Sequence, residues 1–387
     1  MIVQARKSMR NNRLRMLIVG AFPRRNISEH GGVLTSCRVL LASSLPQRAD
    51  LVLVDSSSPS VPPPPIYWRL LRALTRMSLT FWHFVCSRPH VALFFASPGS
   101  SLIEKSVMAG IAKVLGIRTL MFPRGAQIIE DYHSSFLGSL VLRAMFSIPD
   151  KMLCQGKVYQ DFFIDCIGMS KERCPILANW TATNELLQIG ASRSYLFKTD
   201  QQTLLFLGWI ENEKGIFELL DCVKALASNE SLPPIKLVMA GNGSALGKVK
   251  RFLLENRLEA YVELPGWVDI EKKHECLRKA DIFVLPSHME GMPNALIEAM
   301  AAGLPVVATN VGAVPEMLES GTNGIVVEPR DPHALLAAVA LLLSSRELRI
   351  SIGQAAWRTA KEAFGAETAV DRLMELSEEI SGFRGSR

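Results

Sequence analysis

Two glutamates eight residues apart, Glu290 and Glu298, are candidates for binding the two ends of one ligand. The apolar run at 281–286 precedes them and predicts a buried parallel strand, because it is short, continuous and followed by turn residues. Pro293 suits the first position of a helix, which is expected to run to Gly303. Glu290 would then lie in the loop after the strand and Glu298 on the second helical turn. The helix amides between them predict an anion site flanked by carboxylates, suited to a phosphate-bearing ligand with hydroxyls at both ends.

The net charge of +6 hides an asymmetry along the 387 residues. Residues 1–200 hold 24 Lys and Arg against 12 Asp and Glu, a net +12, whereas residues 201–387 hold 19 against 25, a net −6. A basic half predicts an anionic partner, such as a membrane surface, a phosphorylated lipid or nucleic acid. It is equally compatible with a plain basic surface in water.

The cysteines and the hydropathy of the chain predict the cellular compartment of the protein. Seven cysteines are scattered without a CxxC pair, which predicts free thiols in a reducing compartment and no metal framework. The apolar run at 15–20 is too short for a signal peptide. No window reaches the roughly 18 apolar residues of a spanning helix. We therefore expect a cytoplasmic protein, attached at most peripherally to the inner face of the cytoplasmic membrane.

Strand and helix patterns alternate along both halves of the chain. The expected strands include 14–21, 51–54, 90–95, 117–122, 203–208, 235–240, 262–267, 305–309 and 324–327. This alternation predicts an α/β protein of two doubly wound, Rossmann-like domains facing a central cleft, with ligand loops at strand carboxyl ends. The expected domains are 1–190 and 191–365, with a linker within 184–200. A final helix at 366–387 is expected to return to the first domain.

Gly31 and Gly32 stand between the first expected strand and the helix after it. Glycines at this place let the backbone approach a phosphate or a sugar, although such a pair can also be only a turn.

Residues 66–85 are rich in aromatic side chains and place Arg69, Arg72 and Arg76 on one helical face. This pattern is typical of a helix that lies at a membrane interface. It is also typical of a helix packed on the sheet of its domain with its arginines in water. Both interpretations stay open.

An ordered set of motifs occupies the second half. It comprises Phe206-Leu207-Gly208 with Lys214-Gly215, Ala240-Gly241-Asn242-Gly243, Leu264-Pro265-Gly266, Glu290-x7-Glu298, Gly303-Leu304-Pro305-Val306-Val307-Ala308-Thr309 and Gly312-Ala313-Val314-Pro315-Glu316. The Glu-x7-Glu spacing alone is weak evidence, but the ordered set is specific. In this order the motifs resemble the retaining glycosyltransferases of the group 1 family, which have the GT-B fold. The first half is covered only loosely.

The resemblance implies a nucleotide diphosphate sugar as donor and co-substrate, with no separate cofactor and no metal. The second domain would bind the donor and the first domain the acceptor. Glu298 would accept hydrogen bonds from the ribose hydroxyls. Glu290 would face the donor sugar, and Lys214 would neutralise the diphosphate as its bond to the sugar breaks.

The other substrate-binding residues implied by the resemblance surround these three. Amides near the helix start would hold the diphosphate, a loop after the third strand of the second domain would line the base, and the glycine pair of the first domain would close over the ligand. The residues at the helix start are Gly291, Met292, Pro293, Asn294 and Ala295, of which Pro293 has no N–H to offer. The base would be lined by Gly266, Trp267 and Val268, and the glycine pair is Gly31 and Gly32. Gly208 and Trp209, after the first strand of the second domain, complete the substrate-binding set.

The sequence departs from the family pattern at two places. The family usually has an arginine where this chain has Trp209, so one cation for the diphosphate is missing. Many members also have a histidine in the loop that corresponds to 122–127, whereas this chain has Arg124. We take Arg124 as its substitute and as the third catalytic candidate beside Glu290 and Lys214. The alternative for Arg124 is an ordinary surface arginine.

The resulting hypothesis is a retaining glycosyltransferase that moves a hexose-type sugar to a saccharide or a lipid-linked saccharide, in bacterial surface polysaccharide or glycolipid assembly. The basic first domain would meet an anionic membrane surface, and no nucleic-acid partner is expected. A small soluble acceptor is a second possibility. A different class of protein, a catalytically weak regulatory subunit that binds nucleotide sugars, would agree with Trp209 and with the absent histidine.

Overall fold

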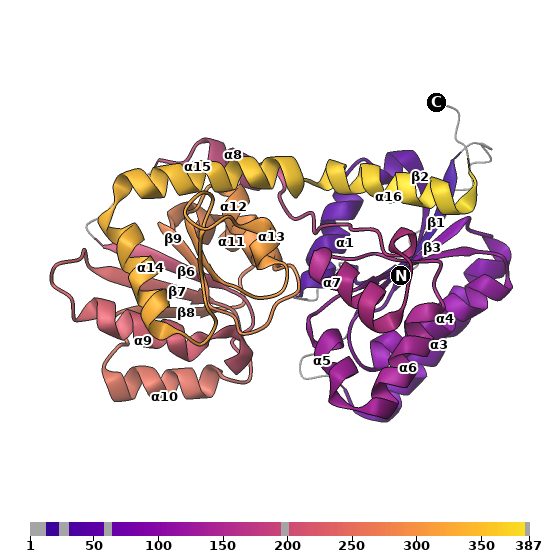
Figure 1. The fold of residues 1–387 in the computed structure, drawn as a ribbon, viewed down its shortest axis with the longest axis horizontal. Coiled ribbons are helices and arrows are strands. Elements are labelled where there is room, and N and C mark those ends of the chain that lie inside the picture. The colour runs from indigo at the N-terminus through magenta and orange to yellow at the C-terminus, as the bar shows by residue number, and fades with distance from the viewer. Residues whose placement is uncertain (1–12, 23–30, 58–63, 195–200, 384–387) are drawn as a thin grey trace. The chain divides into compact units, whose positions relative to one another are not determined.

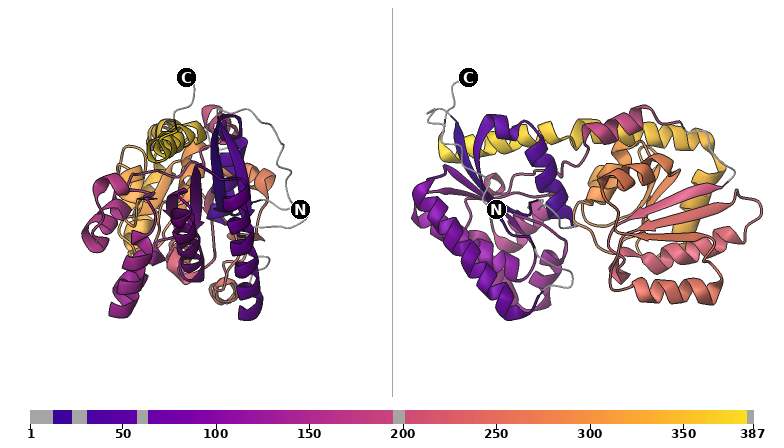
Figure 2. Two further views of the ribbon diagram at one scale, coloured as in Figure 1. Left: turned by 90° about the vertical axis from the view of Figure 1, so that its right-hand side faces the viewer. Right: turned by 180° about the vertical axis from the view of Figure 1, so that it is seen from behind.

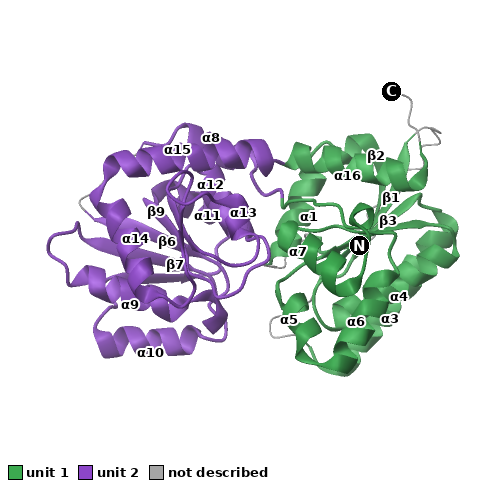
Figure 3. Cartoon of the chain, viewed as in Figure 1, with its two compact units in different colours: residues 1–179, 366–387 green, residues 180–365 purple. Residues whose placement is uncertain are grey.

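The computed structural model describes residues 13–22, 31–57, 64–194 and 201–383 (Figure 1). The chain forms two compact units, shown in Figure 3. Unit 1 comprises Met1–Asn179 and Ala366–Arg387, and unit 2 comprises Trp180–Gly365.

Unit 1 contains a five-stranded parallel sheet in the order β2-β1-β3-β4-β5. Its strands are β1 (Leu14–Gly20), β2 (Ala49–Asp55), β3 (Val91–Ala96), β4 (Arg118–Pro123) and β5 (Lys151–Met152). All six residues of β3 are buried, as expected for a central strand covered on both faces.

The helices of unit 1 cover this sheet. They are α1 (Gly32–Ala42), α2 (Leu45–Arg48), α3 (Ile66–Cys86), α4 (Ser100–Val114), α5 (Gln127–Ser134), α6 (Phe136–Ser147), α7 (Lys157–Asp161) and α16 (Ala366–Ser381), with a π-helix at Phe162–Ile167 and a 3₁₀ turn at Lys171–Arg173. The last helix, α16, belongs to unit 1 although it follows unit 2 in the chain. Lys151 Nζ lies 2.8 Å from Glu379 Oε1, and Ser44 N donates to Glu367 Oε1 at 3.0 Å.

Unit 2 contains a six-stranded parallel sheet in the order β11-β10-β9-β6-β7-β8. Its strands are β6 (Gln202–Leu207), β7 (Ile235–Ala240), β8 (Val262–Gly266), β9 (Ile282–Leu285), β10 (Val306–Thr309) and β11 (Ile325–Val327). Its helices are α8 (Asn184–Ala191), α9 (Ile216–Ala227), α10 (Leu246–Asn256), α11 (Ile270–Lys279), α12 (Asn294–Ala301), α13 (Val314–Met317), α14 (Pro332–Ser344) and α15 (Arg346–Ala363).

The structure differs from the sequence-based expectation over 184–191, where we expected linker. These residues form α8, whose first turn is capped by the Thr183 hydroxyl. The helix packs tightly in unit 2, since a Cβ on Gly190 would lie 2.3 Å from Trp357 and 2.4 Å from the Ala301 carbonyl oxygen. Two helical turns are too few to give a clear hydrophobic period, and packing rather than periodicity stabilises them.

None of the described helices combines the length and the hydropathy that a bilayer-spanning segment requires.

Candidate functional site

The order of strands in unit 2 brings two loops together. β6 and β9 are paired in the sheet. The chain runs outward from β6 to β7 and β8 on one side, and outward from β9 to β10 and β11 on the other. The carboxyl ends of the strands at such a switch point are where open α/β sheets bind ligands. The loop after β6 carries Lys214, at the end of a 3₁₀ turn, and the loop after β9 carries Glu290.

Lys214 and Glu290 form an ion pair at this point, with Lys214 Nζ 2.6 Å from Glu290 Oε1. The same carboxylate oxygen accepts a hydrogen bond from Ser287 Oγ at 2.7 Å. The side chain of Glu290 is 11% exposed, so the loop holds this carboxylate in one place with its charge compensated. The Thr309 hydroxyl at the end of β10 donates to the Ser287 carbonyl and fixes that serine in turn.

Close backbone contacts hold the two loops against one another. Gly215 has φ +63°, and a Cβ built on it would lie 1.9 Å from the Pro286 carbonyl oxygen. Gly312 has φ +55°, and its Cβ would lie 2.0 Å from the Glu290 carbonyl oxygen. Only glycine tolerates both the left-handed backbone and the contact at these two positions. The Lys214–Glu290 distance therefore depends on them.

His288 makes two further links between these loops. Its backbone N–H donates to the Glu213 carbonyl at 2.8 Å, and its Nε2 lies 2.7 Å from Glu218 Oε1 at the start of α9. These contacts hold the loop two residues before Glu290.

The helix expected at Pro293 is α12, which begins one residue later, at Asn294. Pro293 precedes the helix in extended backbone, with ψ 117°, and its carbonyl accepts the first helical hydrogen bond from Ile297 N at 3.3 Å. The helix runs from Asn294 to Ala301 with Ala302 as its C-cap, and Gly303, with φ +70°, follows as the expected stop. Pro293 offers no side-chain cap to the first turn. The amides at this end consequently rely on other partners.

A second Lys–Glu pair flanks α12. Glu298 lies on α12 with 6% of its side chain exposed, and its Oε1 is 2.6 Å from Lys273 Nζ on α11. A buried carboxylate is costly without such a partner. Lys273 was missed by the sequence analysis, because α11 carries four basic residues and nothing in its sequence distinguishes Lys273 from the others.

Trp209 and Trp267 form an aromatic pair, with ring centroids 4.7 Å apart and planes at 84°. Both rings are half-buried, as is Val268. The backbone around them joins three strand ends, because Gly208 N donates to Ala240 O at 3.1 Å and Gly241 N donates to Gly266 O at 2.9 Å. Trp209 therefore contributes an aromatic face where the resemblance implies a cation.

Comparison with known proteins identifies this unit. Residues 190–359 match the family of glycosyl transferases group 1. This segment belongs to the group 1 glycosyltransferase family. The match includes every site residue of unit 2 described above, from Gly208 to Gly312.

Several named proteins are similar to the chain. An uncharacterized glycosyltransferase of Methanocaldococcus jannaschii is 28% identical over 249 residues, which cover 64% of this chain and 65% of that protein. The chain thus spans slightly less than two thirds of that relative. The lipopolysaccharide core biosynthesis glycosyltransferase LpsE of Rhizobium meliloti is 22% identical over 259 residues, 66% of this chain and 73% of that protein.

Solved structures extend the likeness to both sheets. Sucrose-phosphate synthase of Thermosynechococcus elongatus superposes with a TM-score of 0.74 at 15% identity, covering 96% of this chain and 100% of the other. Anabaena HepE in complex with UDP-glucose superposes with a TM-score of 0.70 at 14% identity, covering 95% and 100%. The protein has the GT-B fold, built from two doubly wound parallel sheets.

The remaining candidates lie in unit 1, outside the matched segment. Gly31 and Gly32 begin α1, and a Cβ on Gly31 would meet nothing within 4 Å, so the backbone there borders open space. Residues 23–30 of the same loop lie outside the described residues.

Arg124 is not the surface arginine that we considered as its alternative. It follows β4, is 7% exposed, and lies with its guanidinium 4.9 Å from the centre of the Phe122 ring. The guanidinium donates to Asn179 Oδ1 and, at 3.0 Å, to Ser36 Oγ. Burial lowers the pKa of Arg124 to about 10, so the side chain keeps its charge at neutral pH. A buried cation held by neutral oxygens favours a role toward an anion, and this role stays a prediction.

The described part of the chain contains no candidate metal site. There, no three His, Cys, Asp or Glu side chains are grouped in a way that could hold a metal ion.

Proposed function

We propose that the chain is a retaining glycosyltransferase that moves a hexose-type sugar from a nucleotide diphosphate sugar to a saccharide or lipid-linked saccharide. The observation that carries the proposal is the pair of Lys–Glu contacts, Lys214–Glu290 and Lys273–Glu298, on the two sides of the α12 N-terminus. Helix amides attract phosphate, and carboxylates accept hydrogen bonds from sugar hydroxyls. A nucleotide diphosphate sugar has the matching order of groups, with the sugar at Glu290, the diphosphate at the helix amides and the ribose at Glu298.

The names of similar proteins give the proposal its biological direction. LpsE is named for lipopolysaccharide core biosynthesis, and HepE was crystallised with UDP-glucose. We place the present chain in bacterial surface polysaccharide or glycolipid assembly. Its location would be the inner face of the cytoplasmic membrane, since residues 1–200 carry a net +12 that suits an anionic lipid surface.

The reaction begins with loss of the diphosphate from the donor sugar. The bond between the anomeric carbon and its phosphate oxygen breaks, and the electron pair leaves with the diphosphate. Lys214 has three N–H donors, so Nζ can keep its contact with Glu290 while it binds a phosphate oxygen. Its charge, together with the α12 amides, offsets the negative charge that grows on the leaving group.

Glu290 and the leaving phosphate complete the transfer. The carboxylate of Glu290 stabilises positive charge on the sugar ring and binds its hydroxyls. The acceptor hydroxyl attacks the anomeric carbon from the face that the phosphate leaves, and its proton passes to the leaving phosphate oxygen. The configuration of the sugar is therefore retained. Arg124, as the buried cation of unit 1, is proposed to act on the anionic leaving group or the donor sugar.

The nucleoside is bound around Glu298 and the tryptophan pair. Glu298 accepts hydrogen bonds from both ribose hydroxyls, and Lys273 holds that carboxylate in place. Gly266, Trp267 and Val268 line the base, whose flat face stacks on the half-buried aromatic surface.

Replacing Lys273 by methionine is expected to weaken binding of a nucleoside diphosphate about tenfold, because it leaves Glu298 buried without its cation and adds repulsion to the diphosphate. Calorimetric titration with a panel of nucleoside diphosphates measures the change. Lys272→Met, which removes the same charge from an exposed neighbouring residue, is the matched control and should bind as the wild type does. Equal affinities for both variants would remove Lys273 from the site.

The deciding experiment for the proposed function is a donor screen. Nucleotide release is measured for a panel of sugar nucleotides, each with saccharide and lipid-linked saccharide acceptors, on the wild type and on Glu290→Ala. We expect release that requires an acceptor, is lost in the variant and is unchanged by EDTA. Tight nucleotide binding without turnover for any donor would favour the regulatory subunit instead.

A further inference from the structure

The exposed large apolar side chains of the described residues concentrate on three helices of unit 1. α3, α4 and α6 lie side by side in one layer over the sheet (Figure 1 and Figure 2). Trp82 on α3 is 63% exposed and Phe136 on α6 is 83% exposed, and they are accompanied by Trp68, Leu71 and Leu74. Contiguous apolar surface of this kind marks an interaction site in a folded protein.

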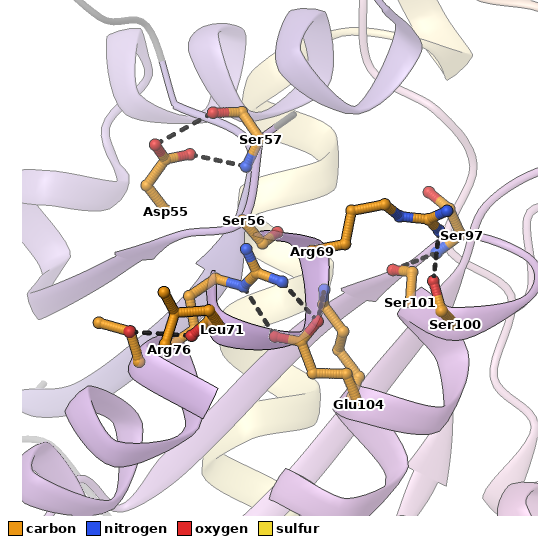
Figure 4. Close-up of polar contacts among 12 residues, drawn as sticks. Asp55, Ser56, Ser57, Arg69, Leu71, Arg76, Ser97, Ser100, Ser101 and Glu104 are labelled. Carbon is orange, nitrogen blue, oxygen red and sulfur yellow. Dashed lines mark hydrogen bonds and ion pairs between the residues drawn. The ribbon is translucent and has the colours of Figure 1, made fainter. Parts of the chain in front are cut away.

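The orientation of α3 explains why its apolar side chains point outward. Arg76 donates from Nε and from one terminal nitrogen to the two carboxylate oxygens of Glu104 on α4, at 2.7 Å each. Arg69 donates to Ser100 Oγ at 3.0 Å at the start of α4, and Figure 4 shows both contacts. The polar face of α3 is therefore turned toward its neighbour. A surface helix of a globular protein normally does the reverse and buries its apolar face.

This arrangement corrects one of the two interpretations of 66–85. Arg69 and Arg76 do not simply extend into water from a helix packed by its apolar face, because they bind α4. Of the 21 residues of α3, only Thr80 and Phe84 are buried. Most of the apolar surface of the helix is left for a partner outside unit 1's own core.

A hollow between α3 and α4 belongs to the same surface. It has a volume of about 380 Å³ and is lined entirely by apolar residues, namely Phe81, Val107, Gly110, Ile111, Val114 and Leu115. Hydrocarbon fills such a hollow more favourably than water does, because its lining offers no polar partner.

The charges on these helices select the occupant. Arg72 on α3, Lys113 on α4 and Arg143 on α6 are exposed. The single carboxylate on the three helices is Glu104, and it is buried in the pair with Arg76. A second copy of the chain that docked through the same three helices would meet this surface with like charge. An anionic bilayer offers both hydrocarbon and opposite charge, and tryptophan favours its interface.

We propose that the outer surface of α3, α4 and α6 inserts into the headgroup layer of an anionic lipid bilayer, with the basic side chains at its border. The apolar side chains enter the upper part of the acyl chains, as in other interfacial helices, and no segment crosses the membrane. This inference rests on the membrane location proposed above, but it does not depend on the donor or on the transfer reaction.

The test is co-sedimentation of the full chain with phosphatidylcholine vesicles that contain or lack phosphatidylglycerol. The wild type should bind the anionic vesicles and lose affinity as salt rises. The triple variant Trp68→Ser, Leu71→Ser, Leu74→Ser should bind about 100-fold more weakly, because it loses three large apolar side chains that would leave water. Arg72→Gln should weaken binding about fivefold, which is the effect of one basic residue near an anionic surface.

The matched control is Leu254→Ser with Leu341→Ser, which removes exposed leucines from unit 2 and should leave vesicle binding unchanged. Nucleoside diphosphate affinity without vesicles should be the same in all variants, which separates a folding defect from lost docking. Equal vesicle binding by the wild type and the triple variant would overturn the proposal. So would a wild type that self-associates without lipid while the triple variant stays monomeric. If the wild type bound anionic vesicles but turned over no donor, the proposed reaction would be wrong and the proposed membrane surface would still be supported.

Discussion

Replacing Glu290 by glutamine is expected to lower kcat about 100- to 1000-fold while changing KM for the donor much less. Glutamine keeps the shape and one oxygen of the side chain, so sugar hydroxyls can still bind. It removes the negative charge that stabilises positive charge on the sugar ring. Initial rates of nucleotide release at varied donor concentration measure both constants. Glu259→Gln, an exposed glutamate of the same unit, is the control and should keep the wild-type kcat.

The pairing of Glu290 with Lys214 adds a sharper test. Lys214→Met also leaves Glu290 as a largely buried carboxylate without its cation, so it should lower kcat by a similar factor. If the two residues act as a unit, the double variant Lys214→Met, Glu290→Gln should be about as slow as the slower single variant. A double variant whose loss equals the product of the two single losses would contradict a common role in the same step.

Replacing Gly215 by alanine is expected to lower the free energy of unfolding of unit 2 by about 3 kcal/mol or more. The new Cβ would lie 1.9 Å from the Pro286 carbonyl oxygen, and φ +63° is a strained backbone angle for alanine. The backbone must move at the base of both loops, so Lys214 and Glu290 should separate and the transfer rate should fall as well. Thermal unfolding and initial rates measure the two effects.

Gly247 gives the matched comparison for this variant. It lies in α10 of the same unit, and a Cβ on it would meet nothing within 4 Å. Gly247→Ala should therefore keep the wild-type activity and raise the melting temperature slightly, since alanine is the better helix former. If Gly215→Ala had the same melting temperature and the same transfer rate as Gly247→Ala, the close contact with Pro286 would not hold the loops together.

The strand pattern of the sequence predicted most of the architecture, because the central strands of parallel sheets are continuous apolar runs. The run at 281–286 became β9, and 90–95 became β3. The short helix α8 was missed for the opposite reason. It is stabilised by packing of Gly190 and by the Thr183 cap, and neither is visible as a period in eight residues.

The sequence by itself determined the motif order that places residues 190–359 in the group 1 glycosyltransferase family, and it placed Glu290 in a loop and Glu298 on the helix after it. These are local properties, fixed by the order of apolar runs, glycines and prolines along the chain. Only the tertiary structure decided which residues these carboxylates face. Lys214 is 76 residues from Glu290 and reaches it because β6 pairs with β9, which no local period encodes.

The same reason applies to the other contacts that the sequence left open. Trp209 meets Trp267 because β6, β7 and β8 end side by side, and Arg124 is buried because α1 and the segment at Asn179 cover it. For α3, periodicity gave a basic face and an apolar face, but only the position of Glu104 on α4 decided which of the two turned outward. A side chain's surroundings depend on the elements packed against it, and those are set by the folded chain as a whole.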